Sequence, residues 1–363
     1  IKKKLRDKSA VFVLDGIQSI YDVEKFLDVI NSKTSFVIVA TRLKFNQADQ
    51  SRLFLEQLEI PEQFSWEEAK SVTLSITRTP LKNSDHGVFN KIYERVAGLP
   101  LAIVILAGLS SATRLTWKTI EKSMMESSMK SLEFGEKASK HDSVRVAFDL
   151  SYRYLKRKAP NATGVFMKTG LFARPKGQLS ALQHVSNLNE ALFQSAIDTL
   201  VHANLIRIGS DSNYSEGWST HALLRDYAEE IRLRKDFRRV AAEKRYVDYY
   251  GKIALGFEDK FNQGIIHPLE FADAVPEICH AIEIAVNHNW GKEAVWLIRS
   301  SISPMIAFGQ FSSLEFLEKI MEKEIKLSSR ERVVLLGGLA KIKLWRNDHH
   351  GAIQLLEKII SAE

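Results

Sequence analysis

Near the start of the chain, apolar residues form two short runs that no polar residue interrupts. The first run covers residues 10–14 and ends on Asp15, and the second covers residues 36–40 and leads into Thr41 and Arg42. Between them, apolar residues recur with helical spacing. Short, β-branched apolar runs are typical of strands that are buried on both faces of a parallel sheet. The pattern therefore predicts a βαβ unit.

The residues that end these two runs are candidates for nucleotide chemistry. In open parallel sheets, ligands bind beyond the carboxyl ends of the strands. Asp15 is expected there as a ligand of a nucleotide-bound Mg²⁺ ion, and Arg42 as a contact to a phosphate group. Charged residues at strand ends are also common as plain solvated positions, so the two residues become informative only together with further motifs.

The next part of the chain changes from apolar runs to helical spacing. A third short strand is expected at residues 74–76. Apolar residues then recur with helical spacing over residues 88–96, a break follows at Gly98 and Pro100, and a nearly all-apolar segment runs to Leu109. This pattern predicts a small helical domain around the break. Taken alone, the break also fits a simple turn between two helices.

Residues 143–234 predict a winged helix, because three helical segments are followed by a β-hairpin that returns through Trp218. Thr220 is a good N-cap for a helix that begins at His221. The free N–H groups of a helix N-terminus attract anions, so a β-phosphate is expected beside His221. The alternative is a solvent-facing histidine in the first helical turn.

From about residue 240 the pattern is helix after helix, with an internal repeat. The sequence LEKIM at residues 317–321 returns as LEKII at residues 356–360, which is 39 residues later. This offset is close to the length of tetratricopeptide-like helix pairs, which stack into a solenoid with a concave binding face. We expect the solenoid to continue beyond residue 363 and its concave face to bind a protein or small-molecule trigger.

Four short motifs occur in the order in which they are found in the NB-ARC family of signal-transduction ATPases, which this chain resembles over nearly its whole length. They are VFVLDG, similar to a Walker B strand, ATR, GLPL, and Thr-His-Ala at residues 220–222, similar to the family's Met-His-Asp motif. The resemblance implies that Asp15 is the metal ligand and catalytic residue. It assigns nucleotide binding to Thr41, Arg42, Gly98, Leu99, Pro100 and His221.

The resemblance also implies a mechanism and partners. The cofactors are ADP or ATP with Mg²⁺. ADP would hold a closed state, and a ligand on the repeats, with exchange to ATP, would open the protein so that it self-associates and activates an N-terminal effector domain outside this chain. Family members act in signal transduction and innate immunity, and we expect a cytoplasmic location.

Three departures from the family pattern limit the expected activity. Gly16 follows Asp15 where the family has a second acid or a polar residue, and Ala222 replaces the aspartate after His221. The sequence contains no G-x-x-x-x-G-K-[ST] phosphate-binding loop, which we expect upstream of residue 1. At most a slow ATPase is therefore expected. Two alternatives stay open: a repeat-containing transcription regulator whose DNA-binding domain lies elsewhere, and a nucleotide-free structural scaffold.

Composition and charge further restrict the classes of protein that the motifs leave open. The chain has 363 residues, of which 45% are hydrophobic and 26% charged, as expected for about two to three globular domains. Cys279 is the single cysteine, which excludes an internal disulfide and fits a reducing compartment. The net charge is +7, and we interpret the basic cluster at residues 232–245 as a solvated helix face. Residues 189–204, the expected recognition helix, contain no Lys or Arg, which argues against nucleic acid.

The expected fold class is an α/β nucleotide-binding remnant with a partial parallel sheet, followed by mainly α domains. The longest apolar stretch, residues 99–109, is too short to span a bilayer. The expected boundaries are 1–78 for the C-terminal part of the nucleotide-binding domain, 79–142 for the small helical domain, 143–236 for the winged helix and 237–363 for the α-solenoid.

Overall fold

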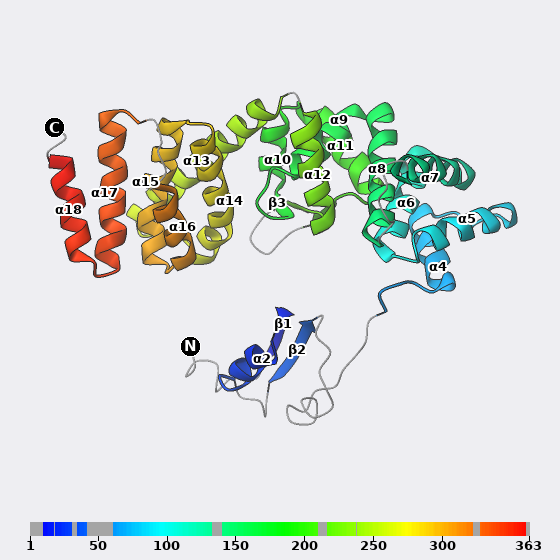
Figure 1. The fold of residues 1–363 in the computed structure, drawn as a ribbon, viewed down its shortest axis with the longest axis horizontal. Helices are drawn as coiled ribbons and strands as arrows, with labels where there is room; N and C mark the ends of the chain where they lie inside the picture. The colour runs from blue at the N-terminus through cyan, green and yellow to red at the C-terminus, as the bar shows by residue number, and fades with distance from the viewer. Residues whose placement is uncertain are drawn as a thin grey trace. The chain divides into compact units, whose positions relative to one another are not determined.

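A computed structural model describes most of the chain, and it divides the chain into two compact units, Ile1–Glu62 and Gln63–Glu363. The described residues are 10–17, 19–30, 35–41, 61–132, 140–209, 216–236, 238–321 and 327–360. Within these ranges the fold is mainly helical, with one two-stranded parallel sheet and one three-stranded antiparallel sheet (Figure 1).

The first unit contains the predicted βαβ arrangement. Strand β1 (Val11–Ile17) is followed by helix α2 (Ile20–Leu27) and strand β2 (Phe36–Thr41). The two strands are parallel, with Val11 opposite Phe36 and Asp15 opposite Ala40. The helix begins at Ser19, whose side chain accepts a hydrogen bond from the backbone of Tyr21. The prediction of a parallel pair with a helical crossover is confirmed.

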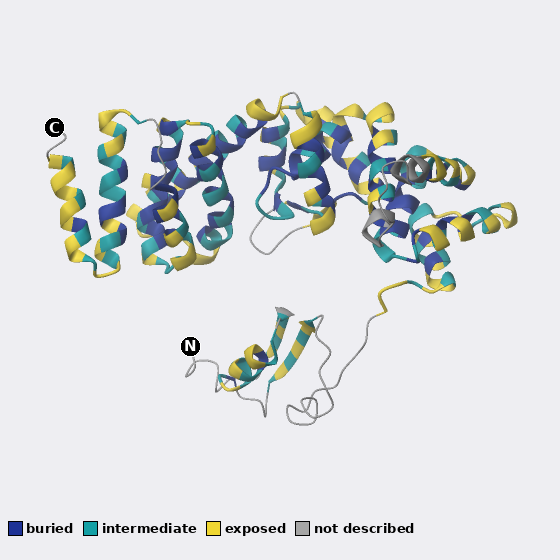
Figure 2. Ribbon diagram, in the orientation of Figure 1, coloured by how far each residue is buried: buried dark blue, intermediate teal, exposed yellow. Residues whose placement is uncertain are grey.

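The expected burial of both sheet faces is wrong for this unit. Val11, Val13 and Phe36 are 67%, 65% and 69% exposed, as the alternating colours of the strands in Figure 2 show. The opposite face is covered by α2, where Phe26 meets Phe12 edge to face at 5.3 Å between ring centroids. A single crossover helix can cover only one face of a sheet, so the second face needs a further layer.

The second unit begins with four helices around an apolar centre. The predicted strand at residues 74–76 is wrong, because these residues lie in the last turns of the first of these helices. A capping box between Ser65 and Glu68 starts that helix, and its buried face recurs at Ala69 and Thr73, one helical turn apart. Helical capping and periodicity therefore override the short strand-like pattern of Leu74, Ser75 and Ile76. The helices are α4 (Trp66–Thr77), α5 (Asn83–Arg95), α6 (Pro100–Thr113) and α7 (Trp117–Leu132).

The middle of this unit combines helices with a small antiparallel sheet. Strand β5 (Gly217–Ser219) lies between β3 (Lys176–Gln178) and β4 (Arg207–Gly209), and Trp218 at its centre packs against Phe172 at 5.0 Å between ring centroids. The predicted hairpin between β4 and β5 is confirmed, while its turn at residues 210–215 lies outside the described residues. Strand β3 was not predicted, because its sequence Lys-Gly-Gln has no apolar pattern.

The elements of this middle part are α8 (Lys140–Lys158), α9 (Pro160–Thr169), β3 (Lys176–Gln178), α10 (Leu179–Ser186), α11 (Glu190–His202), β4 (Arg207–Gly209), β5 (Gly217–Ser219) and α12 (Ala222–Lys235). Two of the helices approach closely at Gly170, the residue after α9. A Cβ atom there would lie 2.1 Å from the backbone nitrogen of Glu229 in α12, so only glycine permits this contact.

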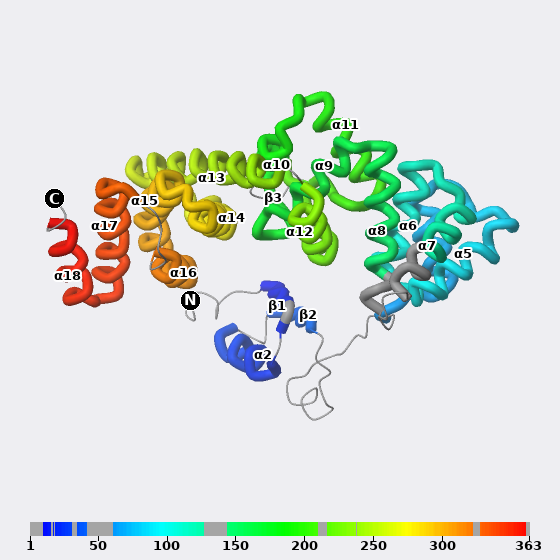
Figure 3. Tube along the Cα trace, turned by 45° about the horizontal axis from the view of Figure 1, so that its top comes forward, coloured from blue at the N-terminus to red at the C-terminus, as the bar shows by residue number. Residues whose placement is uncertain are grey.

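The last part of the unit is a series of helix pairs, traced in Figure 3. The first helices of the pairs are α13 (Arg239–Asn262), α15 (Gly291–Ala307) and α17 (Ser329–Trp345). They pack side by side, and each packs against the second helix of its own pair. The two copies of the internal sequence repeat fall in the second helices α16 and α18, so the repeat in sequence is a repeat in structure. The helices are α13 (Arg239–Asn262), α14 (Pro268–Asn287), α15 (Gly291–Ala307), α16 (Phe311–Met321), α17 (Ser329–Trp345) and α18 (His349–Ile360).

In the ranges that the structure describes, every helix is too short or too polar to cross a lipid bilayer.

Candidate functional site

The carboxyl end of the parallel sheet presents one exposed acid. Asp15 pairs with Ala40 in the strand register, and its side chain is exposed. Thr41, at the end of β2, donates its hydroxyl hydrogen to the carbonyl of Ile17 at 2.6 Å. The Thr41 side chain therefore ties the two strand ends together. Arg42, the predicted phosphate contact, lies outside the described residues.

A lone carboxylate suits one kind of metal site. Among the described residues, the structure contains no group of three or more His, Cys, Asp or Glu side chains placed to hold a metal ion. Mg²⁺ in nucleotide sites usually takes one or two protein carboxylates and completes its shell with water and phosphate oxygens. The exposed Asp15 could supply the one carboxylate that such a site needs.

The GLPL segment forms a tight turn in front of α6. Gly98 has a φ of +63°, and a Cβ atom on it would lie 2.9 Å from the carbonyl oxygen of Phe64. The backbone N–H of Phe64 donates to the Gly98 carbonyl at 2.9 Å, and the Tyr93 hydroxyl donates to the Phe64 carbonyl at 2.8 Å. Leu99 is the N-cap of α6 and Pro100 its first residue. Pro100 suits this position, since a first helical residue needs no N–H partner. The turn therefore has a structural role, whereas its predicted nucleotide contacts stay predictions.

His221 caps α12 with its own side chain. Its Nδ1 atom accepts a hydrogen bond from the backbone N–H of Leu223 at 3.2 Å. The prediction of Thr220 as the N-cap is wrong by one residue. The Thr220 hydroxyl instead donates to the Leu205 carbonyl at 2.7 Å, and its backbone N–H donates to the Pro175 carbonyl at 2.8 Å. The chain leaves the sheet at Thr220, so the helix starts one residue later.

This cap fixes the protonation state of the ring. Desolvation by the surrounding protein, with a smaller contribution from the charge of Arg207, lowers the pKa of His221 below its ordinary value. A ring nitrogen that accepts a hydrogen bond carries no proton, so the cap requires the neutral tautomer with hydrogen on Nε2. The Nε2–H group is the donor that His221 can offer to a ligand.

The predicted site residues do not fall on one element. Asp15 and Thr41 belong to the first unit, which is described by itself. In the second unit, the GLPL turn precedes α6, which packs against α4, α8 and α11, whereas His221 precedes α12, which packs against α9. The two motifs therefore lie on different sets of packed helices.

A buried acid that the sequence did not single out joins the helix pairs to the preceding sheet. Glu277 on α14 is 2% exposed. It accepts hydrogen bonds from the backbone N–H groups of Ala173 and Arg174 at 3.0 and 3.1 Å and from the Tyr246 hydroxyl at 2.5 Å. Its carboxylate thus holds the loop of residues 172–175, between α9 and β3, against α13 and α14.

Two arginines complete the hold on the 172–175 loop. Arg174 donates to the Asp273 carboxylate at 2.8 Å and also to the Asp273 backbone carbonyl. From α12, Arg225 donates its Nε hydrogen to the Phe172 carbonyl at 3.0 Å. We call Arg174, Tyr246, Asp273 and Glu277 the junction network. Sequence periodicity could not reveal it, since the partners are up to 104 residues apart.

A second buried ion pair corrects the interpretation of the basic cluster. Arg232, expected on a solvated helix face, is 4% exposed and donates to Glu243 at 2.6 Å. The other oxygen of Glu243 lies 2.7 Å from Nε2 of His288, whose ring stacks on Trp290. The buried ion pair therefore ties the C-terminal turn of α12 to α13 of the first helix pair.

Comparison with solved structures adds a structural similarity. The chain is similar to the crystal structure of a signal transduction ATPase with numerous domains (STAND) that has a tetratricopeptide repeat sensor, from Pyrococcus horikoshii. The sequence identity is 13% and the TM-score 0.43, and the match covers 99% of this chain and 56% of that one. The chain thus spans about half the length of that protein. No family model matches the sequence. No curated protein matches it either.

Proposed function

We propose that this chain is part of a nucleotide-dependent signalling switch of the NB-ARC and STAND class, with the helix pairs as its sensor. The observation that carries the proposal is the parallel β1–β2 pair, whose register brings Asp15 and Thr41 to the same edge. Ligands of parallel sheets bind at that edge. The GLPL and Thr-His-Ala motifs follow this pair in the family order.

In the proposed switch, each candidate residue has a separate task. Asp15 holds Mg²⁺, and Arg42 with Thr41 contacts the phosphates. The turn at Gly98, Leu99 and Pro100 lies against the base, where a rigid apolar ring packs without hydrogen bonds. His221 donates its Nε2 hydrogen to the β-phosphate of ADP, at the positive end of a helix dipole. Nucleotide exchange at this site is expected to control opening, self-association and the effector domain.

The junction network supports a mechanical connection between sensor and switch. A displacement of α14 moves Glu277, which holds the 172–175 loop through two backbone N–H groups. That loop also accepts a hydrogen bond from Arg225, one helical turn after His221 on α12. Because the network is buried and hydrogen-bonded, the first helix pair and the start of α12 are expected to move together.

Hydrolysis is proposed to be slow. In this chain Gly16 follows Asp15, so the position where the family has an acid or a polar residue offers no side chain to orient water. The nucleotide then acts mainly as a ligand whose exchange sets the state of the switch. Turnover is expected below the common enzyme range of about 1 s⁻¹ and above.

The decisive experiment is nucleotide binding by the natural full-length protein. Fluorescent ADP and ATP are titrated with and without Mg²⁺, using wild type, Asp15→Asn and, as control, Asp28→Asn, which changes an exposed acid after α2. We expect Asp15→Asn to weaken Mg²⁺-dependent binding about tenfold or more, and the control to bind like wild type. Absence of binding by wild type contradicts the switch and favours the structural scaffold. Equal binding by Asp15→Asn removes Asp15 from the site.

A further inference from the structure

A pocket with polar walls lies between the C-terminal end of α6 and one face of α11. Its volume is about 630 Å³, which is within the usual range for ligand-binding pockets. We call it the Arg114 pocket. At the end of α6 it is lined by Ser111, Ala112 and Arg114, and along α11 by residues spaced three or four apart, among them Ser195, Asp198 and His202.

The pocket opens beside a close contact between the two chain segments. A Cβ atom on Gly108 of α6 would lie 2.5 Å from the backbone carbonyl oxygen of Ala203, the residue after α11, so only glycine permits this approach. Ser111 follows Gly108 by one helical turn, and His202 directly precedes Ala203. Both line the pocket. A ligand there would therefore contact α6 and α11 next to the point where they are already held together.

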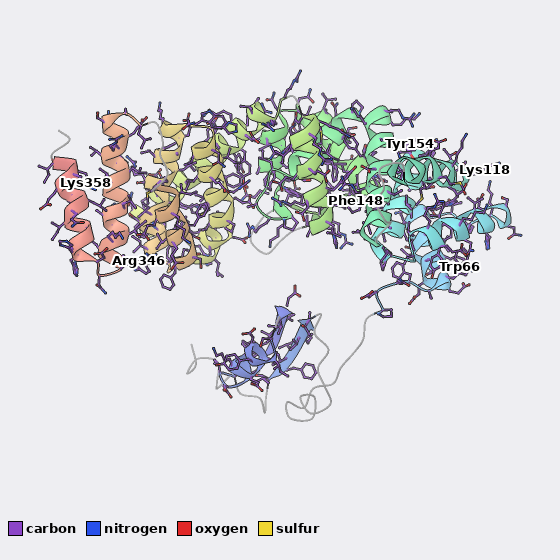
Figure 4. The ribbon with its side chains drawn as sticks, viewed as in Figure 1. Trp66, Lys118, Phe148, Tyr154, Arg346 and Lys358 are labelled. Atoms are coloured by element: carbon purple, nitrogen blue, oxygen red, sulfur yellow. The ribbon has the colours of Figure 1, made fainter. Side chains whose placement is uncertain are left out.

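Two side chains of opposite charge line the pocket, one from each helix. Arg114 is the C-cap of α6, and Asp198 belongs to α11. Both are exposed, and within the described ranges neither forms an ion pair with the other or with a third residue. Lys118, labelled in Figure 4, is the next cation along the chain and does not line the pocket. The pocket therefore has one positive side and one negative side.

Neutral hydrogen bonds position the negative side without cancelling its charge. Gln194 donates from its side-chain amide to the Asp198 carboxylate at 2.9 Å. Nδ1 of His202 lies 2.6 Å from the backbone carbonyl oxygen of Asp198. A carbonyl oxygen only accepts, so Nδ1 carries the hydrogen, and Nε2 of the neutral ring is an acceptor. Asp198 and His202 thus offer acceptors to a ligand, whereas the Arg114 guanidinium offers only donors.

We propose that the Arg114 pocket binds a free amino acid, with its α-carboxylate on Arg114 and its α-ammonium group on Asp198. A zwitterion neutralises both side chains at once. A simple anion is repelled by Asp198 and a simple cation by Arg114, so neither gains as much. The guanidinium can hold the carboxylate through two parallel hydrogen bonds. Ala112, Ala191 and Ser195 have small side chains, which leave room for the side chain of the ligand.

The Arg114 pocket is separate from the proposed nucleotide contacts. Pro100 begins α6 and Arg114 follows its last residue, so this 14-residue helix places them about 20 Å apart. The proposal therefore goes beyond the nucleotide switch and does not depend on it. Because the ligand adds contacts between α6 and α11 in the folded state alone, it is expected to stabilise the fold.

The first test measures binding of the twenty amino acids to the whole chain at pH 7.5, without nucleotide. Two partly solvated ion pairs give weak binding, with a dissociation constant on the order of 1 mM, so each ligand is added at about 10 mM. At least one amino acid is expected to raise the melting temperature, whereas acetate and methylammonium leave it unchanged. No shift with any amino acid overturns the proposal. An equal shift with acetate overturns the assignment of a zwitterion.

The second test assigns each charge by pairing a protein variant with a changed ligand in calorimetric titrations. The methyl ester of the best amino acid lacks the carboxylate, and the N-acetyl form lacks the ammonium group. Each is expected to bind wild type about fivefold more weakly than the free amino acid. In Arg114→Gln the ester should bind at least as well as the free amino acid, because the carboxylate has lost its partner. The same holds for the N-acetyl form in Asp198→Asn. Undiminished discrimination in these variants overturns the assignment.

Arg78 provides a matched control. It is also an exposed C-cap in the left-handed conformation, at the end of α4, and it does not line the pocket. Arg78→Gln should bind the amino acid like wild type, and so should Asp226→Asn on α12. A loss in Arg78→Gln as large as that in Arg114→Gln contradicts the site. Circular dichroism without ligand checks that each variant keeps the fold.

The outcomes distinguish this site from the nucleotide switch. Nucleotide binding through Asp15 is measured without amino acid. Amino-acid binding with no nucleotide binding in wild type supports the Arg114 pocket and removes the switch. Nucleotide binding with no amino-acid binding removes the pocket and leaves the switch.

Discussion

The buried carboxylate of Glu277 on α14 accepts a 2.5 Å hydrogen bond from the Tyr246 hydroxyl on α13. Burial, together with the adjacent negative charge of Glu277, raises the pKa of Tyr246 well above its ordinary value. Tyr246 therefore keeps its hydroxyl proton and is a hydrogen-bond donor at neutral pH. This donor orients the Glu277 carboxylate toward the 172–175 loop. The Tyr246–Glu277 hydrogen bond within the first helix pair therefore positions the Glu277 hydrogen bonds that connect this pair to the preceding sheet.

Removing the Glu277 carboxylate is expected to destabilise the protein strongly. In Glu277→Ala, the N–H groups of Ala173 and Arg174 and the hydroxyl of Tyr246 lose their acceptor in a buried place. We expect a loss of about 3 kcal/mol or more in the free energy of unfolding, measured by urea denaturation. The control Glu283→Ala, on the exposed side of the same helix, should change it by less than about 0.5 kcal/mol. Similar losses in both variants would mean that the junction network contributes nothing specific.

Two glycines on neighbouring elements are expected to respond in opposite directions to alanine. Gly98→Ala places a Cβ atom in a left-handed backbone and close to the Phe64 carbonyl, at an expected cost of about 1–3 kcal/mol. Gly87 lies inside α5 with open space around it, so Gly87→Ala is expected to stabilise the protein by about 0.5–1 kcal/mol. Thermal melting of both variants measures the difference. A Gly98→Ala variant as stable as wild type contradicts the turn described here.

The cap at His221 predicts a pH dependence of stability. The pKa of His221 is lowered in the folded protein, so the unfolded chain binds a proton first as the pH falls. The contribution of the cap is fully present above the ordinary value of 6.5 and is lost as the pH falls through the lower, folded-state value. His221→Asn keeps a capping side chain that does not titrate. We expect the melting temperature of wild type to fall more between pH 7.5 and pH 5 than that of His221→Asn; parallel curves would rule out the neutral cap.

Cys279 on α14 is expected to react slowly with alkylating reagents. Burial raises the pKa of its thiol to about 11, so at neutral pH very little reactive thiolate forms. Labelling with iodoacetamide at pH 7.5, followed by mass spectrometry, should be slow in buffer and fast in denaturing urea. Rapid labelling of the native protein would indicate that this part of α14 opens readily.

Local sequence determined the elements whose partners are near in the chain. The two apolar runs and the helical segment between them predicted the parallel pair β1–β2, and the turn after residue 208 predicted the hairpin β4–β5. Helical periodicity and the 39-residue repeat likewise predicted the helix pairs. These features depend on side-chain periodicity and turn chemistry, which can be read from consecutive residues.

Tertiary structure decided which of these residues are buried and which are exposed to solvent. Residues 74–76 became helix because Ala69 and Thr73 pack inward from a capped start, and Val11 stays exposed because one helix covers one sheet face. Arg232, on a segment that appeared solvated, is buried because Glu243 lies opposite it. Glu277 looks like any helical acid in the sequence. Its role comes from its hydrogen bond with the backbone N–H of Ala173, 104 residues earlier in the chain. Because Glu277 is buried, water cannot replace this hydrogen bond if it is lost.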